Sequence, residues 1–198
     1  TLRECIDADI HAAVIITAGF GETGPEGKAL EQAVLSIARA GDIRIVGPNT
    51  MGVFSAYPSR MQAVMTASQF KQGAVAVVSQ SGNLGTSIAD RFIRREIGIS
   101  RLVSSGNEAD LTIEDYLEYL ETDDQTRVIC LYVEGVRQGR RFIDTIRRIS
   151  AAKPVILLKG GTGTIGAGAA MSHTGALAGS FAVFRSVCSQ ANIIVADT

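Results

Sequence analysis

The sequence of 198 residues has no tryptophan and only seven phenylalanines and four tyrosines, so it offers few aromatic rings on which nucleic acid bases could stack. An excess of positive charge is also missing, because 19 lysines and arginines stand against 20 aspartates and glutamates. Binding to a phosphate backbone depends on clustered basic side chains. The composition therefore argues against a nucleic acid partner.

Long apolar runs are absent as well: none approaches the ~20 residues of a membrane-spanning helix, and the N-terminus lacks a secretory signal. Cysteine is scarce, with Cys5, Cys130 and Cys188 far apart in apolar surroundings. We expect free, buried thiols in a reducing compartment and no metal site. These absences predict a cytoplasmic protein without membrane contact. The start at Thr1, in what reads as the middle of a helix, suggests a piece of a longer protein.

Hydrophobic residues make up 46% of the chain, which is enough for a sizeable core. Short β-branched runs alternate with helical patterns, and this order predicts an α/β fold with a parallel sheet. The periodicity fades around Pro58, between residues 55 and 73, so we expect a domain boundary there. The predicted domains are residues 1–72 and 73–198.

The second predicted domain has five strands separated by four helices, which matches a flavodoxin-like, doubly wound sheet. Its predicted strands are 75–78, 101–104, 128–133, 155–158 and 193–195, and its predicted helices are about 84–95, 112–121, 138–151 and 178–190. The first domain is predicted to run from a strand at 13–17 through a helix to a strand at 43–46. Sheets of this kind bind ligands at the carboxyl ends of their strands.

The segment SQSGNLG (79–85) follows the first strand of the second domain and opens a helix. The first amides of a helix have no partner within it, and the helix dipole favours an anion there. Ser81, Gly82 and Asn83 are therefore candidates for binding phosphate. The alternative is that Ser81 or Asn83 only caps the helix.

Two further candidates follow later strands. Glu134 stands at the end of the strand 128–133, and His173 follows the glycine-rich stretch 160–170. An imidazole is nucleophilic near neutral pH, and a neighbouring carboxylate stabilises its charged form. His173 on a pliant loop would thus be a group carrier with Glu134 as its partner. Taken singly, each is more simply read as a solvent-exposed loop residue.

Motifs of other enzyme classes are weak in this sequence. The spacings Gly19-x-Gly21-x-x-Gly24 and Gly161-x-Gly163-x-x-Gly166 fit the dinucleotide-binding pattern, but chance matches are expected in a chain with 21 glycines. A Walker loop is absent, and the segment around Ser81 lacks the flanking glycines of a hydrolase nucleophile elbow. A dinucleotide-dependent oxidoreductase remains a rival interpretation.

Taken in order, three segments resemble the nucleoside-diphosphate-forming acyl-CoA synthetases, which include ADP-forming acetyl-CoA synthetase and, more distantly, the α subunit of succinyl-CoA synthetase. The segment SHTGALAGS (172–180) resembles the phosphohistidine loop of that family, SQSGNLG (79–85) its phosphate-binding helix start, and GPNT (47–50) its turn near the CoA thiol. The resemblance runs over essentially the whole chain. Met51 and Ala18 depart from the succinyl enzymes, which have Pro and Glu there, and favour the acetyl/acyl branch.

The resemblance implies a role for each candidate. His173 would be phosphorylated and Glu134 would orient and stabilise it. The phosphate-binding residues would be Ser81, Gly82, Asn83 and Gly175, and the CoA-binding residues Thr17, Ala18, Gly19, Asn49 and Thr50. The implied fold is the C-terminal part of a Rossmann-type CoA-binding domain followed by the flavodoxin-like domain.

The implied reaction converts acyl-CoA, phosphate and ADP into a carboxylic acid, CoA and ATP. An ATP-grasp domain or β subunit outside this sequence would bind ATP, ADP and Mg²⁺, and the enzyme would be an oligomer. The alternative is a regulatory module that senses CoA or acyl-CoA within a protein acetyltransferase. The presence of both His173 and Glu134 argues against that alternative, because a sensor needs neither.

Overall fold

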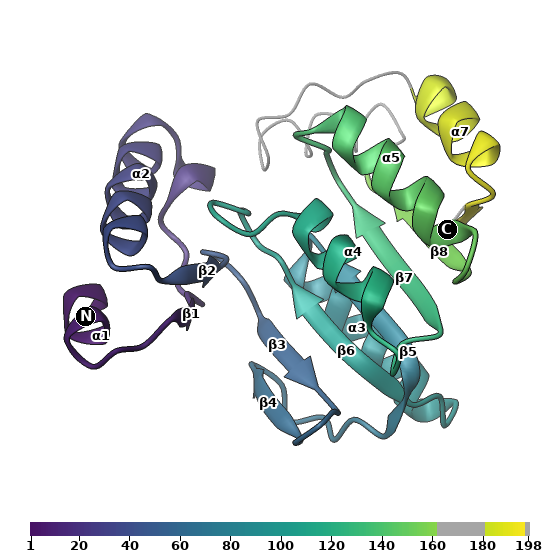
Figure 1. Cartoon of the computed structure of the whole chain (residues 1–198), viewed down its shortest axis with the longest axis horizontal. Helices are drawn as coiled ribbons and strands as arrows, with labels where there is room; N and C mark the ends of the chain where they lie inside the picture. Colours follow the sequence, from purple (N-terminus) through teal and green to yellow (C-terminus); the bar gives the residue numbers. More distant parts are fainter. Residues whose placement is uncertain (162–180, 197–198) are drawn as a thin grey trace.

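The structure is a computed structural model that describes residues 1–161 and 181–196. Its larger part is a seven-stranded sheet with helices on both faces, and its smaller part is a two-stranded sheet with its own helices (Figure 1). The strands are β1 (Ala12–Val14), β2 (Arg44–Val46), β3 (Gly52–Ser55), β4 (Met61–Val64), β5 (Gln72–Ser79), β6 (Ile99–Ser104), β7 (Val128–Val133), β8 (Val155–Lys159) and β9 (Ile194–Ala196). The helices are α1 (Leu2–Asp7), the 3-10 turn η1 (Gly21–Thr23), α2 (Pro25–Ala40), α3 (Gly82–Arg94), α4 (Ile113–Thr122), α5 (Gly139–Ser150) and α7 (Phe181–Gln190).

The large sheet has the strand order β4-β3-β6-β5-β7-β8-β9, and the strands from β6 to β9 run parallel. Numbered within that parallel part, the order is 2-1-3-4-5, so the predicted flavodoxin-like α/β fold is confirmed. In this topology the connections from β5 and β7 leave toward opposite faces. A crevice therefore opens between the carboxyl ends of these two strands, where such folds bind ligands.

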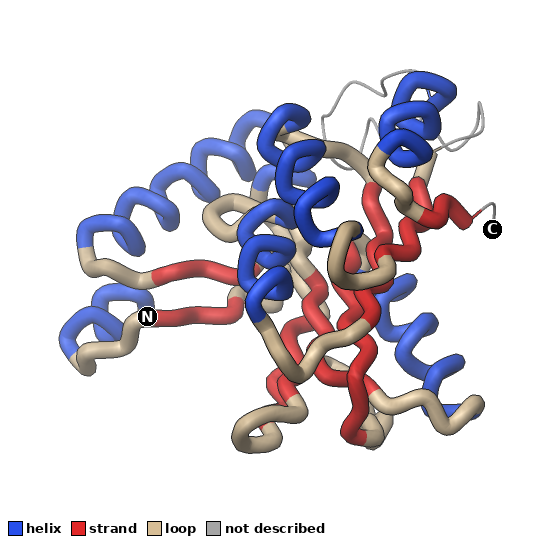
Figure 2. Tube along the Cα trace, turned by 45° about the vertical axis from the view of Figure 1, so that its right-hand side comes forward, coloured by secondary structure: helices blue, strands red, loops and turns tan. Residues whose placement is uncertain are grey.

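Alternation along β5 builds a core on each face of the sheet. Ala76 and Val78 point into a cluster with helices α4 and α5, whereas Val77 points into a cluster with helix α3. All three side chains are fully buried. A strand covered on both faces has to be apolar at every position, which explains the unbroken run AVAVV (74–78). Figure 2 shows helices on both sides of this sheet.

Strands β3 and β4 were not among the predicted elements. They form an antiparallel hairpin that pairs with β6 through Val53, Phe54 and Ser55, and it extends the large sheet by two strands. The Phe54 ring is buried with its centroid 4.9 Å from that of Phe70. The chain thus changes from the small sheet to the large one between β2 and β3, within predicted domain 1–72. The boundary after residue 72 stays a prediction.

The small part is a parallel βαβ unit. Strands β1 and β2 pair in parallel, and α2 packs Ala38 against Ile43 and Ile45. Asp110, from the loop after β6, fastens this unit to the large sheet, since its Oδ2 accepts hydrogen bonds from Arg44 Nε and Ile45 N, each at 2.9 Å.

Gly106 allows a second contact between the small unit and the large sheet. It has φ +62°, and a Cβ there would collide with the carbonyl oxygen of Pro48. Only glycine both tolerates this conformation and allows the two loops to approach so closely.

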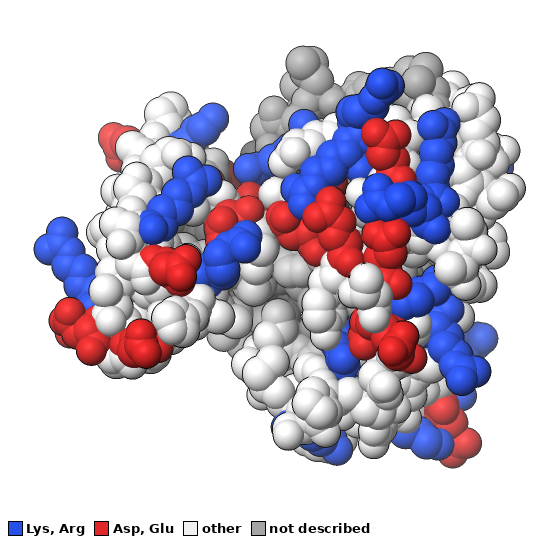
Figure 3. Space-filling model, viewed as in Figure 1, with Lys and Arg blue, Asp and Glu red and all other residues white. Residues whose placement is uncertain are grey.

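Charges of both signs are interspersed on the face shown in Figure 3. Over α4 and α5 they form ion pairs: Arg141 contacts Asp115 at 2.8 Å and Glu118 at 2.7 Å, and Arg148 contacts Glu121 at 2.9 Å. Within the described residues, no helix combines the length and the apolar character needed to cross a membrane.

The three thiols are free, but the prediction that all are buried is wrong for two of them. Cys5 and Cys130 are partly exposed, because each lies at the edge of a cluster, and only Cys188 is buried.

Candidate functional site

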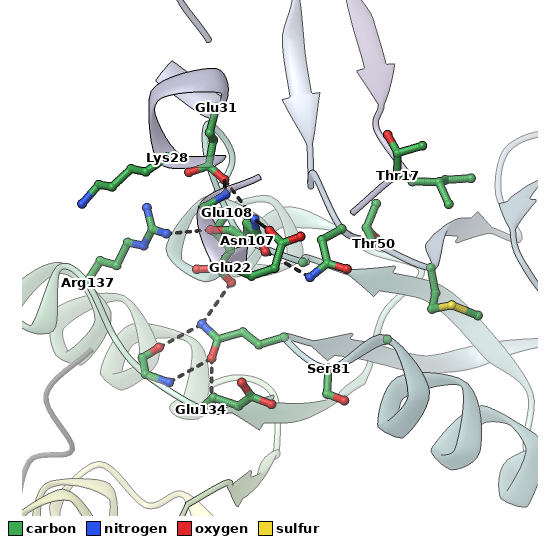
Figure 4. A pocket seen from close by; sticks show the side chains of 18 of the residues that line it. Thr17, Glu22, Lys28, Glu31, Thr50, Ser81, Asn107, Glu108, Glu134 and Arg137 are labelled. Atoms are coloured by element: carbon green, nitrogen blue, oxygen red, sulfur yellow. Dashed lines mark hydrogen bonds between the residues drawn. The ribbon is translucent and has the colours of Figure 1, made fainter. Parts of the chain in front are cut away.

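A cavity of about 1120 Å³ lies between the small unit and the carboxyl ends of the parallel strands. Six segments and Met65 contribute to its wall. The segments are residues 16–17 after β1, η1 with the first half of α2, the turn 49–51, the turn 80–83, the loop 106–108 and the turn 134–137. Side chains from both parts of the molecule point into it in Figure 4. Its position is the crevice that the strand order of the large sheet creates.

The turn 80–83 presents the start of helix α3 to the cavity. Ser81 is the N-cap, and its Oγ accepts a hydrogen bond from Leu84 N at 3.4 Å. The amides of Gly82 and Asn83 lie in the first turn, where a helix offers them no acceptor. Ser81 therefore caps the helix, and the amides of Gly82 and Asn83 stay available for an anion. Phosphate binding by Ser81, Gly82 and Asn83 stays a prediction.

Glu134 lies at the end of β7 and lines the same cavity. Its backbone is held on both sides: Glu134 N donates to Gln80 Oε1 at 2.6 Å, and Lys159 Nζ donates to Glu134 O at 2.8 Å. Burial lowers the pKa of Lys159, while burial and the adjacent Glu134 carboxylate raise the pKa of Tyr132 to about 12. The predicted anion-binding turn and the predicted partner carboxylate therefore meet in one cavity.

Glu108 is a cavity residue that the sequence analysis missed. Only 3% of it is exposed. Its Oε1 accepts hydrogen bonds from Ser105 Oγ at 2.7 Å and from Gln80 Nε2 at 3.1 Å. Burial raises the pKa of Glu108 to about 7, with Glu114 adding to the effect and the two hydrogen bonds and Arg137 opposing it. Its setting in the segment GNEAD (106–110) reads as a polar turn, so no sequence signal marks it.

On the opposite wall, Asn107 joins two acidic residues of the small unit. Its Nδ2 donates to Glu22 Oε2 at 2.5 Å and to Glu31 Oε2 at 3.0 Å. Burial alone would raise the pKa of Glu22, but hydrogen bonds from Asn107 and from the amides of Gly19 and Phe20 lower it overall. The charged Glu22 carboxylate thus connects the small unit to the loop carrying Asn107 on this side of the cavity.

The five predicted CoA-binding residues divide into two groups. Thr17, Asn49 and Thr50 line the cavity. Ala18 and Gly19 are not among the described residues that line it, and the Gly19 amide is occupied by Glu22 Oε1 at 2.6 Å.

His173 and Gly175 lie outside the described residues. The chain that leads to them leaves β8 beside Glu134, because Gly160 N donates to Val133 O at 2.9 Å and a Cβ added at Gly160 would lie 3.3 Å from Glu134 Cγ.

Comparison with known proteins agrees with this geometry. Residues 72–198 match the family described as the succinyl-CoA ligase like flavodoxin domain. The chain belongs to this family. The resemblance noted in the sequence is thereby confirmed, and it accounts for the 2-1-3-4-5 order of the parallel strands.

Relatives of this succinyl-CoA ligase like domain match the whole chain. The α subunit of an ADP-forming acetate–CoA ligase II of Pyrococcus furiosus is 43% identical over 198 residues, which are 100% of this chain and 43% of that subunit. The α subunit of the corresponding ligase I is 41% identical over 100% of this chain and 42% of the relative.

Among solved structures, acetyl-coenzyme A synthetase 1 of Ca. Korarchaeum cryptofilum, described as dinucleotide forming and in complex with phosphate and ADP, superposes with a TM-score of 0.92. It is 40% identical, and the match covers 100% of this chain and 42% of that one. The chain thus spans less than half the length of these relatives.

Metal ligands do not gather in the described part of this family member: no group of three or more His, Cys, Asp or Glu side chains there could hold an ion. Of the described cavity residues, Lys28 and Arg137 are the cations. Arg137 Nη2 donates to Asn107 O at 2.6 Å. Backbone amides and these two side chains are therefore the groups that attract an anion.

The buried Glu108 predicts a pH-dependent stability. A carboxyl group whose pKa is about 7 when folded and 4.5 when unfolded stabilises the fold fully below pH 4.5 and loses that contribution as pH rises through 7. Glu108→Gln keeps the acceptor for Ser105 and Gln80 without the charge. We expect the variant to gain roughly 3 kcal/mol over the wild type at pH 8 and nothing at pH 4.5. Denaturant unfolding at both pH values measures this, and an equal difference at both would contradict it.

Proposed function

We propose that the protein containing this chain is an acid–CoA ligase that interconverts acyl-CoA, phosphate and ADP with a carboxylic acid, CoA and ATP through phosphohistidine at His173. The observation that carries the proposal is the shared cavity, in which the α3 amides and Glu134 meet at the carboxyl ends of β5 and β7. The similarity to α subunits of ADP-forming acetate–CoA ligases supports it.

In the first step, a phosphate oxygen attacks the thioester carbonyl of acyl-CoA, the C–S bond breaks, and CoA leaves as a thiolate that takes up a proton. The products are acyl phosphate and CoA. The amides of Gly82 and Asn83 at the start of α3 would hold the phosphate with its attacking oxygen toward the cavity. Ser81 fixes their direction by capping the helix.

In the second step, one imidazole nitrogen of His173 attacks phosphorus, and the bond to the carboxylate oxygen breaks. The carboxylic acid leaves as its anion. The Glu134 carboxylate would accept a hydrogen bond from the other ring nitrogen, which fixes the tautomer and stabilises the positive charge that develops on the ring. Gly175 would add a backbone amide to the phosphate.

Chain length allows this contact and the next transfer. Eleven residues lie between Gly161, the last described residue of that segment, and His173. An extended chain of that length reaches about 40 Å. From an anchor beside Glu134, that length is enough for His173 to reach the cavity, and it would let His173 travel to a nucleotide site within about 40 Å.

In the third step, an oxygen of ADP attacks the phosphoryl group, the P–N bond breaks, and His173 regains its neutral form as ATP leaves. We assign ADP, ATP and Mg²⁺ to an ATP-grasp domain or β subunit, consistent with the relatives that are named as subunits. Mg²⁺ would neutralise charge on the nucleotide phosphates. The CoA thiol would approach along Thr17, Asn49 and Thr50, which line the cavity, while Ala18 and Gly19 would contact CoA from outside the cavity lining.

The test uses the full-length protein with its nucleotide-binding partner. Given acetyl-CoA, phosphate and Mg-ADP, we expect ATP and free CoA to form in equal amounts and in strict dependence on phosphate. Other acyl-CoA thioesters should be assayed in the same way, since the chain does not fix the acyl group. CoA binding in calorimetry without ATP formation from any of them would contradict the proposal.

A further inference from the structure

The side chain of Gln80 joins the two halves of the proposed site. Its Oε1 accepts hydrogen bonds from Glu134 N at 2.6 Å and Gly135 N at 3.0 Å. Its Nε2 donates to Gly135 O at 2.9 Å and to Glu108 Oε1 at 3.1 Å. A glutamine amide has two acceptor positions and two donor hydrogens, so all four are in use. The dashed lines beside Glu134 in Figure 4 are among these bonds.

Gln80 also belongs to the anion-binding turn, because it directly precedes Ser81, the N-cap of α3. Its own backbone N donates to Tyr132 O at 3.2 Å. One residue thus contacts the end of β7 through both backbone and side chain. Any displacement of the turn carrying Glu134 relative to the start of α3 has to break bonds to Gln80.

A second layer holds the amide in this orientation. Glu108 accepts from Gln80 Nε2, so the NH₂ group has to face Glu108 and the carbonyl oxygen has to face the amides of Glu134 and Gly135. Ser105 Oγ fixes Glu108 at 2.7 Å, and Ser105 N donates to Ser79 O at 2.8 Å. A flipped amide would lose these bonds, so a single orientation is selected.

We propose that Gln80 is a positioning residue, which sets the Glu134 carboxylate against the start of α3 through the turn 134–135. This proposal rests on the function proposed above. The arrangement of Gln80 with Glu134, Gly135 and Glu108 is here named the Gln80 bridge. Gln80 itself need not touch the reacting atoms, because its contacts are to the backbone of the Glu134 turn and to Glu108.

The experiment measures the rate at which the full-length enzyme with its nucleotide-binding partner phosphorylates His173 from Mg-ATP. Gln80→Met keeps the length of the side chain and removes all four hydrogen bonds. We expect labelling to slow by roughly 10- to 100-fold, the usual cost of a misplaced catalytic group. Gln62→Met is the matched control. Gln62 lies on β4 and is not among the described residues that line the cavity, so removing its 3.0 Å hydrogen bond to Ser68 O should leave the rate unchanged.

A double variant distinguishes positioning of Glu134 by Gln80 from a general destabilisation of the site. If Gln80 acts through Glu134, then Gln80→Met should add little to Glu134→Gln, and the double variant should label at nearly the rate of Glu134→Gln alone. A folded Gln80→Met enzyme that labels like the wild type would overturn the proposal. So would a double variant in which the two effects multiply in full.

If Gln80→Met fails to fold, Ser105→Ala tests the proposal instead, because it removes the hydrogen bond from Ser105 Oγ that holds Glu108. We expect labelling to slow by roughly 2- to 5-fold, and an unchanged rate would overturn the proposal. Wild-type labelling is measured first. Its absence would contradict the proposed function and the Gln80 bridge with it, whereas a normal wild type beside an unaffected Gln80→Met contradicts the bridge alone.

Discussion

The His173→Asn variant of the full-length enzyme is expected to lose ATP formation by at least ~10⁴-fold. The asparagine side chain occupies part of the space of the imidazole ring. Its amide nitrogen, however, is not nucleophilic and cannot carry a phosphoryl group. The first step does not involve His173, so stoichiometric release of CoA from acyl-CoA and phosphate should persist. ATP formation is followed by a coupled assay, and CoA release by a thiol reagent.

His11→Asn is the matched control for that variant, because His11 is the other histidine of the chain. Its side chain is 67% exposed and contacts Asp9 at 3.5 Å. His11 is not among the described residues that line the cavity. We expect wild-type rates from it. ATP formation by His173→Asn at a rate comparable with His11→Asn would exclude His173 as the carrier.

Glu134→Gln is expected to slow phosphorylation of His173 by roughly 10²- to 10⁴-fold. The substitution conserves shape but removes the negative charge that stabilises the imidazolium. The fold should be unaffected, since the bonds to Gln80 and Lys159 use the backbone of Glu134. Rapid-quench labelling with Mg-ATP measures the rate.

Glu118→Gln provides the comparison for Glu134→Gln. Glu118 pairs with Arg141 at 2.7 Å on the outer face of α4, where its side chain is 41% exposed. We expect unchanged labelling there. An equal, small effect of both substitutions would remove Glu134 from the mechanism.

The parallel part of the fold could be predicted because its elements carry strong local signals. The run AVAVV (74–78) and the amphipathic helices between the strands predict a doubly wound sheet. The hairpin β3–β4 has no such signal, because each of its strands has four residues and β4 alternates only between partly buried and exposed positions. Its place beside β6 is decided by pairing across about 50 residues of sequence.

The site was predictable where it follows a strand end and hidden where it depends on tertiary contact. Glu134 directly follows β7 and Ser81 stands two residues after the end of β5, and the topology brings such positions together. Neither Gln80 nor Glu108 was among the predicted site residues. Their bond joins positions 28 residues apart, which no local pattern reveals.

The most direct test of the account is to find where the phosphoryl group resides. The full-length enzyme is incubated with radiolabelled Mg-ATP, quenched, digested and analysed by mass spectrometry under basic conditions. The account predicts one acid-labile, base-stable label on the peptide that contains His173, and its loss when ADP is added. A label on any other residue, or none on an enzyme that still forms acyl-CoA, would contradict it.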